Sequence, residues 1–254
     1  MATKLQKYQK MRDFGDTPEP SGKSSRKNPA KTLIFVVQKH HASHLHYDFR
    51  LEMEGVLKSW AVPRGPSYDP GTKRLAMMTE DHPYEYASFE GVIPSGNYGA
   101  GNVIIWDEGT WEFIEPGDDP VAALEKGKLT FRLKGKKLIG EWALVQLRGR
   151  SQRGNEWLLL KHRDQYASAK FDVTTEMPLS VISKKSVDEI GSERTWKSNR
   201  EAAPRKARTV ADSLREKKSS TPRRKASSNP ESSSQPSRRS STKASTPRSG
   251  SSRS

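Results

Sequence analysis

Histidines are concentrated in one short stretch of this 254-residue sequence. Four of the six lie within seven residues, at His40, His41, His44 and His46. Residues 44–52 alternate between apolar and polar types, which is typical of a half-buried β-strand. Successive side chains in a strand point to opposite faces, so one face should join the core and the other should line water or a groove. We expect a core face of Leu45, Tyr47, Phe49 and Leu51 and a polar face of His44, His46, Asp48, Arg50 and Glu52.

The polar face of this strand has the residue types of a metal site. His46 and Asp48 are two positions apart, roughly 6–7 Å along the strand, so one small cation can sit between them. His40, at the end of the preceding strand, is expected as a third ligand. Two nitrogens and one oxygen suit Mn²⁺, Zn²⁺ or Fe²⁺ better than Ca²⁺ or Mg²⁺. Arg50 on the same face would then meet an anion held by the metal, and its planar fork fits phosphate.

Other interpretations of the same pattern stay open. Alternation alone shows only a half-buried strand, so His40, Arg50 and the separate His82 are what favour a metal. An iron-dependent oxygenase uses a similar arrangement of two histidines and one carboxylate. A nucleic-acid-binding barrel with a vestigial site is a third class. His41 and His44 lack motif support as ligands, and we expect them to be solvated. A surface or phosphate-facing position is expected for His162.

Short strands separated by turn residues must position these side chains. The pattern predicts an all-β fold with minor helices, as a closed or partly open β-barrel with an active-site groove or as a sandwich. One helix is expected before residue 163, at 120–126, where Pro120 suits the first turn. Five tryptophans are expected in the core: Trp60, Trp106, Trp111, Trp142 and Trp157. The nine expected strands are 32–38, 44–52, 56–62, 75–79, 102–106, 110–115, 129–134, 138–147 and 156–162.

Positive charge is concentrated toward the C-terminus. The formal net charge is +15 and the pI is about 9.9. Residues 184–254 hold 19 Lys and Arg against 7 Asp and Glu, whereas residues 1–183 hold 26 against 23. No aromatic residue follows Trp196, and serine makes up 15 of the last 36 residues. We therefore expect residues 184–254 to be a disordered tail that binds nucleic-acid phosphates through basic side chains such as Arg223, Arg224 and Lys225.

Composition sets the remaining boundaries. Residues 1–31 mix Gly, Ser and Pro with charges and are expected to be a flexible arm, followed by the barrel at 32–170 and a transition segment at 171–183. The absence of cysteine excludes disulfides, iron–sulfur clusters and thiolate zinc sites. No apolar run approaches the roughly 18 residues of a membrane span, and no signal peptide is evident. We expect a monomeric cytoplasmic protein without membrane contact, associated with the nucleoid through DNA.

Five motifs in this sequence resemble one known enzyme family. They are QKHHASHLHYDFRLE at 38–52, GVLKSWAVP at 55–63, EDHP at 80–83, FEGVIP at 89–94 and WLLLKH at 157–162. In this order they are similar to the 3′-phosphoesterase module of bacterial DNA ligase D, from about residue 10 to residue 166. The resemblance implies a β-barrel enzyme that needs Mn²⁺, or another divalent ion such as Co²⁺ or Zn²⁺. Such enzymes remove a 3′-terminal ribonucleotide from DNA in break repair and then hydrolyse the remaining 3′-phosphate to a 3′-OH.

The resemblance also implies roles for individual residues. The matched metal ligands are His40, His46 and Asp48. Residues matched to the phosphate or the active site are Arg50, His82, Tyr86 and Arg74. Those matched to the N-terminal arm, which helps the diesterase step, are Arg12, Asp13 and Glu19. His82 is expected to donate a proton to the leaving oxygen or to hydrogen-bond the transition state.

Two departures from the family pattern stand out. Arg64 replaces a lysine expected in a Val-Pro-Lys-Gly-Pro-Ser segment, which keeps the charge but changes the hydrogen-bond geometry. No ligase or polymerase domain accompanies the motifs, so we expect a stand-alone module. Such a module would meet a separate DNA ligase or other end-joining proteins in trans, at DNA or RNA-tipped DNA 3′ ends.

Overall fold

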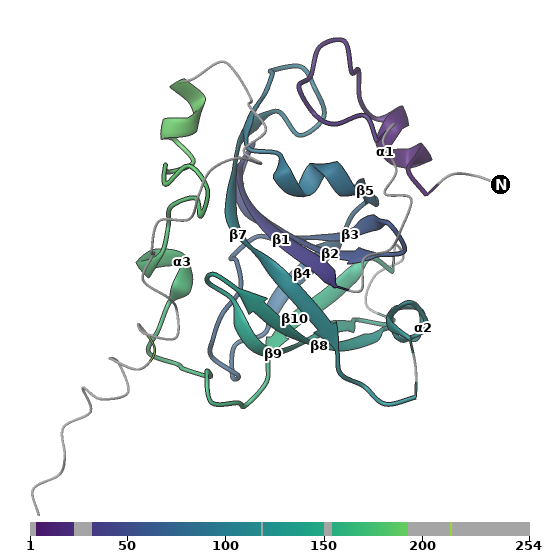
Figure 1. The fold of residues 1–254 in the computed structure, drawn as a ribbon, viewed down its shortest axis with the longest axis vertical. Helices are drawn as coiled ribbons and strands as arrows, with labels where there is room; N and C mark the ends of the chain where they lie inside the picture. Colours follow the sequence, from purple (N-terminus) through teal and green to yellow (C-terminus); the bar gives the residue numbers. More distant parts are fainter. Residues whose placement is uncertain (1–3, 23–31, 118, 150–153, 193–213, 215–254) are drawn as a thin grey trace, which may run out of the picture. The chain divides into compact units, whose positions relative to one another are not determined.

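The computed structural model describes residues 4–22, 32–117, 119–149, 154–192 and 214, and its strands form a closed antiparallel barrel (Figure 1). Eight strands make the ring, in the order β1-β2-β3-β4-β10-β9-β8-β7, and β7 pairs again with β1. Two short strands extend it, because β5 pairs with β3 and β6 with β7. The bounds are β1 Leu33–His41, β2 Leu45–Met53, β3 Val56–Val62, β4 Arg74–Met78, β5 His82–Pro83, β6 Gly91–Ile93, β7 Gly101–Phe113, β8 Lys128–Gly135, β9 Ile139–Gln146 and β10 Glu156–Lys161.

The all-β prediction is therefore confirmed, and the differences lie in short or merged strands. The strands expected at 102–106 and 110–115 are one strand, β7. The glycine between them, Gly109, lies opposite Gly135, and a Cβ added to it would meet the Lys134 carbonyl oxygen at 2.3 Å. Gly109 thus allows two backbones to approach closely and does not mark a turn. The strands β5 and β6 were not predicted, because two or three residues are too few to show a periodicity.

Helices are few and short. The predicted helix is present as α2 (Pro120–Glu125), where the Asp119 side chain accepts hydrogen bonds from two backbone N–H groups of the first turn. The expectation of one helix before residue 163 was wrong, because α1 (Gln6–Lys10) and the 3₁₀ helix η1 (Tyr84–Ser88) also lie there. Two more short helices follow the barrel, α3 (Val173–Glu176) and η2 (Glu189–Ser192). Among the described helices, none has the length and hydropathy that crossing a membrane requires.

The described structure begins well before Thr32, where the folded chain was expected to start. The Tyr8 side chain of α1 is fully buried, and its hydroxyl donates a hydrogen bond to the Pro20 carbonyl at 2.6 Å. Its ring contacts those of Phe14 and Tyr86. Composition misled the prediction, since the few large side chains of residues 4–22 are the ones that pack on the barrel.

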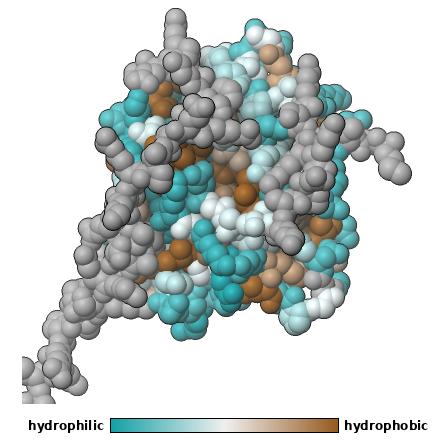
Figure 2. Space-filling model, viewed as in Figure 1, coloured by the Kyte–Doolittle hydropathy of each residue, from teal (hydrophilic) through white to brown (hydrophobic). Residues whose placement is uncertain are grey.

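The barrel core is aromatic, as predicted. All five strand tryptophans have at most 2% of their surface exposed. On β2, Tyr47, Phe49 and Leu51 are buried, whereas Leu45 is 42% exposed. The expectation of a core position for Leu45 was wrong, because Leu45 pairs with His41 at the last position of the β1–β2 ladder, at the edge of the core. In Figure 2, hydrophilic residues cover much of the described surface, with smaller apolar areas between them.

The segment after the barrel packs back on it. Phe171, Val173, Val181, Val187 and Ile190 are buried. The Trp106 indole N–H and the Lys137 ammonium both donate to the Met177 carbonyl, each at 2.8 Å. The fold thus runs to at least residue 192, past the expected tail boundary at 184, and Leu214 beyond it is buried in the main core. Apart from Leu214, residues 193–254 lie outside the described part of the chain, as does the prediction that they are disordered.

Candidate active site

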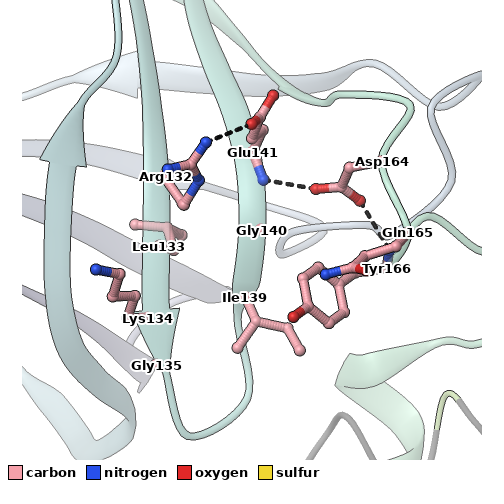
Figure 3. A pocket seen from close by; sticks show the side chains of 10 residues that line it. All are labelled: Arg132, Leu133, Lys134, Gly135, Ile139, Gly140, Glu141, Asp164, Gln165 and Tyr166. Carbon is pink, nitrogen blue, oxygen red and sulfur yellow. Dashed lines mark hydrogen bonds and ion pairs between the residues drawn. The ribbon is translucent and has the colours of Figure 1, made fainter.

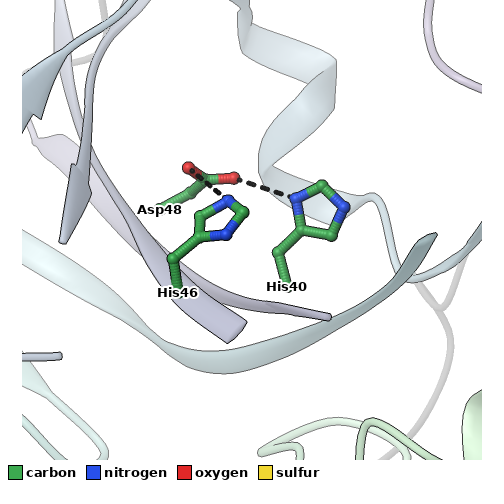
Figure 4. A group of neighbouring side chains, drawn as sticks. All are labelled: His40, His46 and Asp48. Carbon is green, nitrogen blue, oxygen red and sulfur yellow. Dashed lines mark ion pairs between the residues drawn. The ribbon is translucent and has the colours of Figure 1, made fainter. Parts of the chain in front are cut away.

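The strand register brings three predicted metal ligands together at one end of the barrel. His40 on β1 lies directly opposite His46 on β2, and their ring centroids are 4.7 Å apart. Asp48 is two residues further along β2, on the same face as His46. One potential ligand atom from each of the three side chains lies within 4.8 Å of the others. Figure 4 shows both imidazoles pointing toward the carboxylate.

The donor atoms of this triad suit a metal ion. The Nδ1–H of His46 donates to the His44 carbonyl at 2.9 Å, which leaves Nε2 with a free lone pair 3.6 Å from Asp48 Oδ1. His40 Nδ1 lies 3.7 Å from Asp48 Oδ2. Two ligands about 2.1 Å from one ion at a tetrahedral angle are about 3.4 Å apart, close to these separations. Two nitrogens and one carboxylate oxygen are a donor set for a divalent transition metal.

A buried arginine holds the carboxylate of the triad. Arg50 is 2% exposed, and its Nη2 donates to Asp48 Oδ2 at 3.0 Å. Its Nε and Nη1 donate to Gln38 and Ser59, both at 2.8 Å. Burial alone would raise the pKa of Asp48, but the Arg50 guanidinium and the two imidazoles hold it well below its usual value. Asp48 is therefore ionised at neutral pH, as a metal ligand must be.

His82 extends this polar cluster from β5. Its Nδ1 lies 2.8 Å from the Glu80 carbonyl oxygen, which can only accept, so Nδ1 carries the proton and Nε2 keeps a lone pair. Arg12 Nη2 donates to that Nε2 at 3.3 Å. Burial, followed by the charges of Arg50 and Arg12, lowers the pKa of His82 well below its usual value. His82 is therefore a neutral imidazole with an accepting Nε2.

The N-terminal arm, residues 4–22, forms the far wall of this cluster. Arg12 Nε donates to Glu19 at 2.8 Å and Nη1 donates to Glu80 at 3.3 Å. The Tyr86 hydroxyl donates to the same Glu19 oxygen at 2.9 Å. Burial disfavours the charge of Arg12, but Glu19 raises its pKa above the usual value, so the guanidinium stays charged. The arm thus reaches His82 directly through Arg12.

Three predicted residues lie outside this hydrogen-bonded cluster. Asp13 is exposed, and its carboxylate accepts from the Gly15 N–H at 2.9 Å. Arg64 is exposed, in the turn after β3. Arg74 begins β4 and is half-buried, and its Nε has no hydrogen-bond partner in the described structure. Within the described residues, no hydrogen bond or ion pair connects any of the three to the triad.

Several site residues were not predicted. Gln38 and Ser59 orient Arg50, and Glu80 contacts Arg12; all three are buried. Gln38 had a signal, because a buried amide within an otherwise apolar run needs a partner. Of the other histidines, His41 and His44 are exposed as expected, and His41 Nδ1 lies 3.0 Å from Asp188. His162 is partly exposed, as expected for a surface position.

A separate depression of about 700 Å³ lies between the β8–β9 hairpin and residues 164–166 (Figure 3). Its polar groups are paired with one another. Arg132 donates to Glu141 at 2.7 Å, and Asp164 accepts from the backbone N–H groups of Glu141 and Tyr166 at 2.7 and 2.9 Å. These contacts brace the hairpin against the loop that follows β10, and none of the triad residues lines the depression.

A closed antiparallel barrel with two imidazoles, an ionised carboxylate and a buried arginine at one end is an arrangement for metal-assisted chemistry on an anionic ester. Comparison with known proteins narrows this class. Residues 38–146 match the family described as DNA Ligase D 3′-phosphoesterase domain. The barrel thus matches this family, whose 3′-phosphoesterase domains are hydrolases acting on DNA 3′ ends.

Curated relatives share the described part of the chain. The multifunctional non-homologous end joining protein LigD of Pseudomonas aeruginosa is 52% identical over 185 residues, which are 72% of this chain and 22% of that protein. The LigD protein of Mycobacterium tuberculosis is 41% identical over 179 residues, 70% of this chain and 22% of its own length. That of Mycolicibacterium smegmatis is 43% identical over 168 residues, 65% and 21% respectively. The chain thus spans about a fifth of the length of these relatives.

Proposed function

We propose that this protein is a Mn²⁺-dependent phosphoesterase that prepares DNA 3′ ends for joining. It hydrolyses the phosphodiester bond to a 3′-terminal ribonucleotide, which releases a ribonucleoside and leaves a 3′-phosphate on the strand, and then hydrolyses that phosphate to a 3′-OH. The observation that carries the proposal is the direct bond from Arg50 to the metal-ligating Asp48, at 3.0 Å. This bond fixes a phosphate-binding guanidinium beside the place where His40, His46 and Asp48 would hold the ion.

The ion, when bound, neutralises phosphate charge and activates a water molecule. Arg50 supplies the complementary donors. Its bonds to Gln38, Ser59 and Asp48 use three of the five N–H groups of a guanidinium, which leaves two for a non-bridging phosphate oxygen. Because Arg50 is held from three sides, it needs little reorganisation when the substrate's negative charge develops, which is the condition for effective electrostatic stabilisation.

The hydrogen bonds of His82 favour an accepting role over the proton-donating one expected from the sequence. Its only N–H is committed to the Glu80 carbonyl, and its Nε2 lone pair accepts a hydrogen bond from Arg12. In our proposal Arg12 turns to the substrate phosphate, and Nε2 then accepts a hydrogen bond from the attacking water. If His82→Ala retained full turnover on a 3′-phosphate strand, this role would be refuted.

The N-terminal arm is assigned to the diesterase step. Arg12 reaches the reaction centre through His82, so the arm lies beside the group that leaves in the first step. The fully buried Glu19 side chain holds Arg12 in place. We assign the exposed Asp13 and Arg64 and the half-buried Arg74 to substrate phosphates or sugars further from the centre. These contacts should raise KM when lost, with little change in kcat.

The substrate and partners follow from charge and product. The 19 basic residues of 184–254 are proposed to bind the DNA backbone and to associate the protein with the nucleoid. A 3′-OH end is what a DNA ligase or a polymerase requires, so a ligase acting in end joining should consume the product. The contact between these basic residues and the DNA backbone would add affinity for DNA without changing the chemistry at the triad.

The decisive assay uses a primer–template with one 3′-terminal ribonucleotide, with and without Mn²⁺. We expect a shortened strand ending first in 3′-phosphate and then in 3′-OH, and no product from Asp48→Asn. Oxygen consumption with Fe²⁺ and 2-oxoglutarate tests the oxygenase alternative. A barrel that only binds nucleic acid would show salt-dependent binding and no metal-stimulated turnover.

A further inference from the structure

The loop between β6 and β7 passes directly beside the metal triad. Ile93 and Gly101 pair at its base, and two turns shape it, with Asn97 N–H donating to the Pro94 carbonyl and Ala100 N–H to the Asn97 carbonyl. Gly99 has a positive φ of 76°, and a Cβ built on it would lie 3.7 Å from Cε1 of His40. The loop is therefore hydrogen-bonded in place next to a metal ligand.

This loop carries an exposed aromatic ring. Four large apolar side chains are notably exposed in the described part of the chain, and only one of these four is aromatic: Leu45, Leu75, Leu179 and Tyr98. Tyr98 is half exposed, at 50%. A ring this exposed presents a flat face on which a ligand can stack.

The groups around Tyr98 belong to the active site. The Arg12 guanidinium carbon lies 5.5 Å from its ring centroid, and the same guanidinium donates to His82. Burial of part of the ring, together with the charges of Glu80 and Asp48, raises the pKa of Tyr98, so both carboxylates lie within electrostatic reach. The ring thus lies beside Arg12, which contacts the proposed active-site residue His82.

A role in holding Arg12 does not explain the exposed position of the Tyr98 ring. Arg12 already lies over the ring of Tyr8, at 3.9 Å from its centroid, and is paired with Glu19 and Glu80. The longer contact with a half-exposed ring adds little to an arginine held this way. The open ring is therefore available to a ligand.

We propose that Tyr98 stacks against the base of the nucleotide at the 3′ end of the strand. This inference rests on the proposed function, which places the phosphate of that nucleotide at Arg50 and the triad. Stacking suits an enzyme that must accept any sequence, because every base presents a π-face. Tyr98 is in this view a substrate-positioning residue, and the chemistry stays with the triad, Arg50 and His82.

The test compares two strands that differ only in one base. Both end in a 3′-phosphate, and one has an abasic analogue as its terminal nucleotide. In the wild-type protein with Mn²⁺, the strand with the base should have a kcat/KM about tenfold higher, the size typical of one stacked base. Tyr98→Ala should bring this ratio close to one, whereas Tyr98→Phe should keep it. Leu179→Ala, which removes a side chain of similar exposure, serves as the control and should also keep it.

A merely structural role for Tyr98 gives a different result. Tyr98→Ala would then slow both strands equally and leave their ratio unchanged, which overturns the proposal, as does a wild-type ratio near one. A second readout needs no turnover and no variant. A strand with 2-aminopurine as its terminal base should lose fluorescence when it binds the wild-type protein, and unchanged fluorescence of the bound strand refutes stacking. Absence of Mn²⁺-dependent turnover in the wild type, by contrast, refutes the proposed function.

Discussion

The N-terminal arm should be released when Glu19 is truncated. The Glu19 side chain is fully buried, and that of its partner Arg12 is 4% exposed. Glu19 also accepts from the hydroxyls of Tyr86 and Thr17. Removing one partner of a buried ion pair costs about 3–5 kcal/mol, because the other charge stays buried. Since residues 4–22 can detach without opening the barrel, we expect arm opening to increase roughly a hundred- to several-thousand-fold in Glu19→Ala.

Hydrogen–deuterium exchange measured over residues 6–10 reports this opening. Exchange there should accelerate by that factor in Glu19→Ala and by less in Glu19→Gln, which keeps an accepting oxygen. Lys4→Ala is the matched control, because its ion pair with Glu54 is exposed on both sides and contributes little. Glu19→Ala should also lose more activity on a ribonucleotide-tipped strand than on a 3′-phosphate strand. Unchanged exchange in Glu19→Ala would refute the view that this ion pair anchors the arm.

Three further predictions follow from the site and the chain end. Mn²⁺ at 100 times its Kd should stabilise the wild type by about 2.7 kcal/mol and leave Asp48→Asn unchanged, whereas His44→Ala, which keeps its carbonyl, should respond like the wild type in thermal melts. The folded-state pKa of His82 lies below its unfolded value, so its contribution to stability is complete above about pH 6.5 and is lost as the pH falls below that. The pKa shift of Asp48 acts in the same direction only below about pH 4. In urea unfolding of the metal-free protein, the free energy of unfolding should therefore fall more steeply from pH 6.5 to 4.5 for the wild type than for His82→Asn. A chain ending at residue 183 should be about 2–4 kcal/mol less stable than one ending at 192, through the exposure of Ile104 and the loss of Val187 and Ile190; equal midpoints for the two truncations would count against a fold that extends to residue 192.

The grouping of His40, His46 and Asp48 could be predicted because its geometry is local. Strict alternation fixed the face of β2, and the tight connection at 42–44 brought His40 opposite His46. Register in a hairpin follows from the length of its turn, so three ligands within nine residues leave few alternatives. The five core tryptophans were predictable for a similar reason, since each lies on the apolar face of a strand.

The rest of the site depends on contacts that leave no periodic signal. Arg12 and His82 are 70 residues apart, and only the packing of Tyr8 and the arm on the barrel brings them together. Glu80 and Ser59 lie within two of the family-like motifs, but no periodicity indicates that Glu80 contacts Arg12 or that Ser59 contacts Arg50. The segment after residue 170 was also unpredictable, because isolated residues such as Val187 pack in an irregular chain whose composition is polar.

The strand β1 has two tasks that are usually separate. It completes the ring by pairing with both β2 and β7, and at one position His40 lies between His46 and Val103 on these neighbours. A folding intermediate with an open seam would leave His40 unrestrained on one side, so its ligand set would be imprecise. Hydrolytic competence should therefore arise only with the completed barrel.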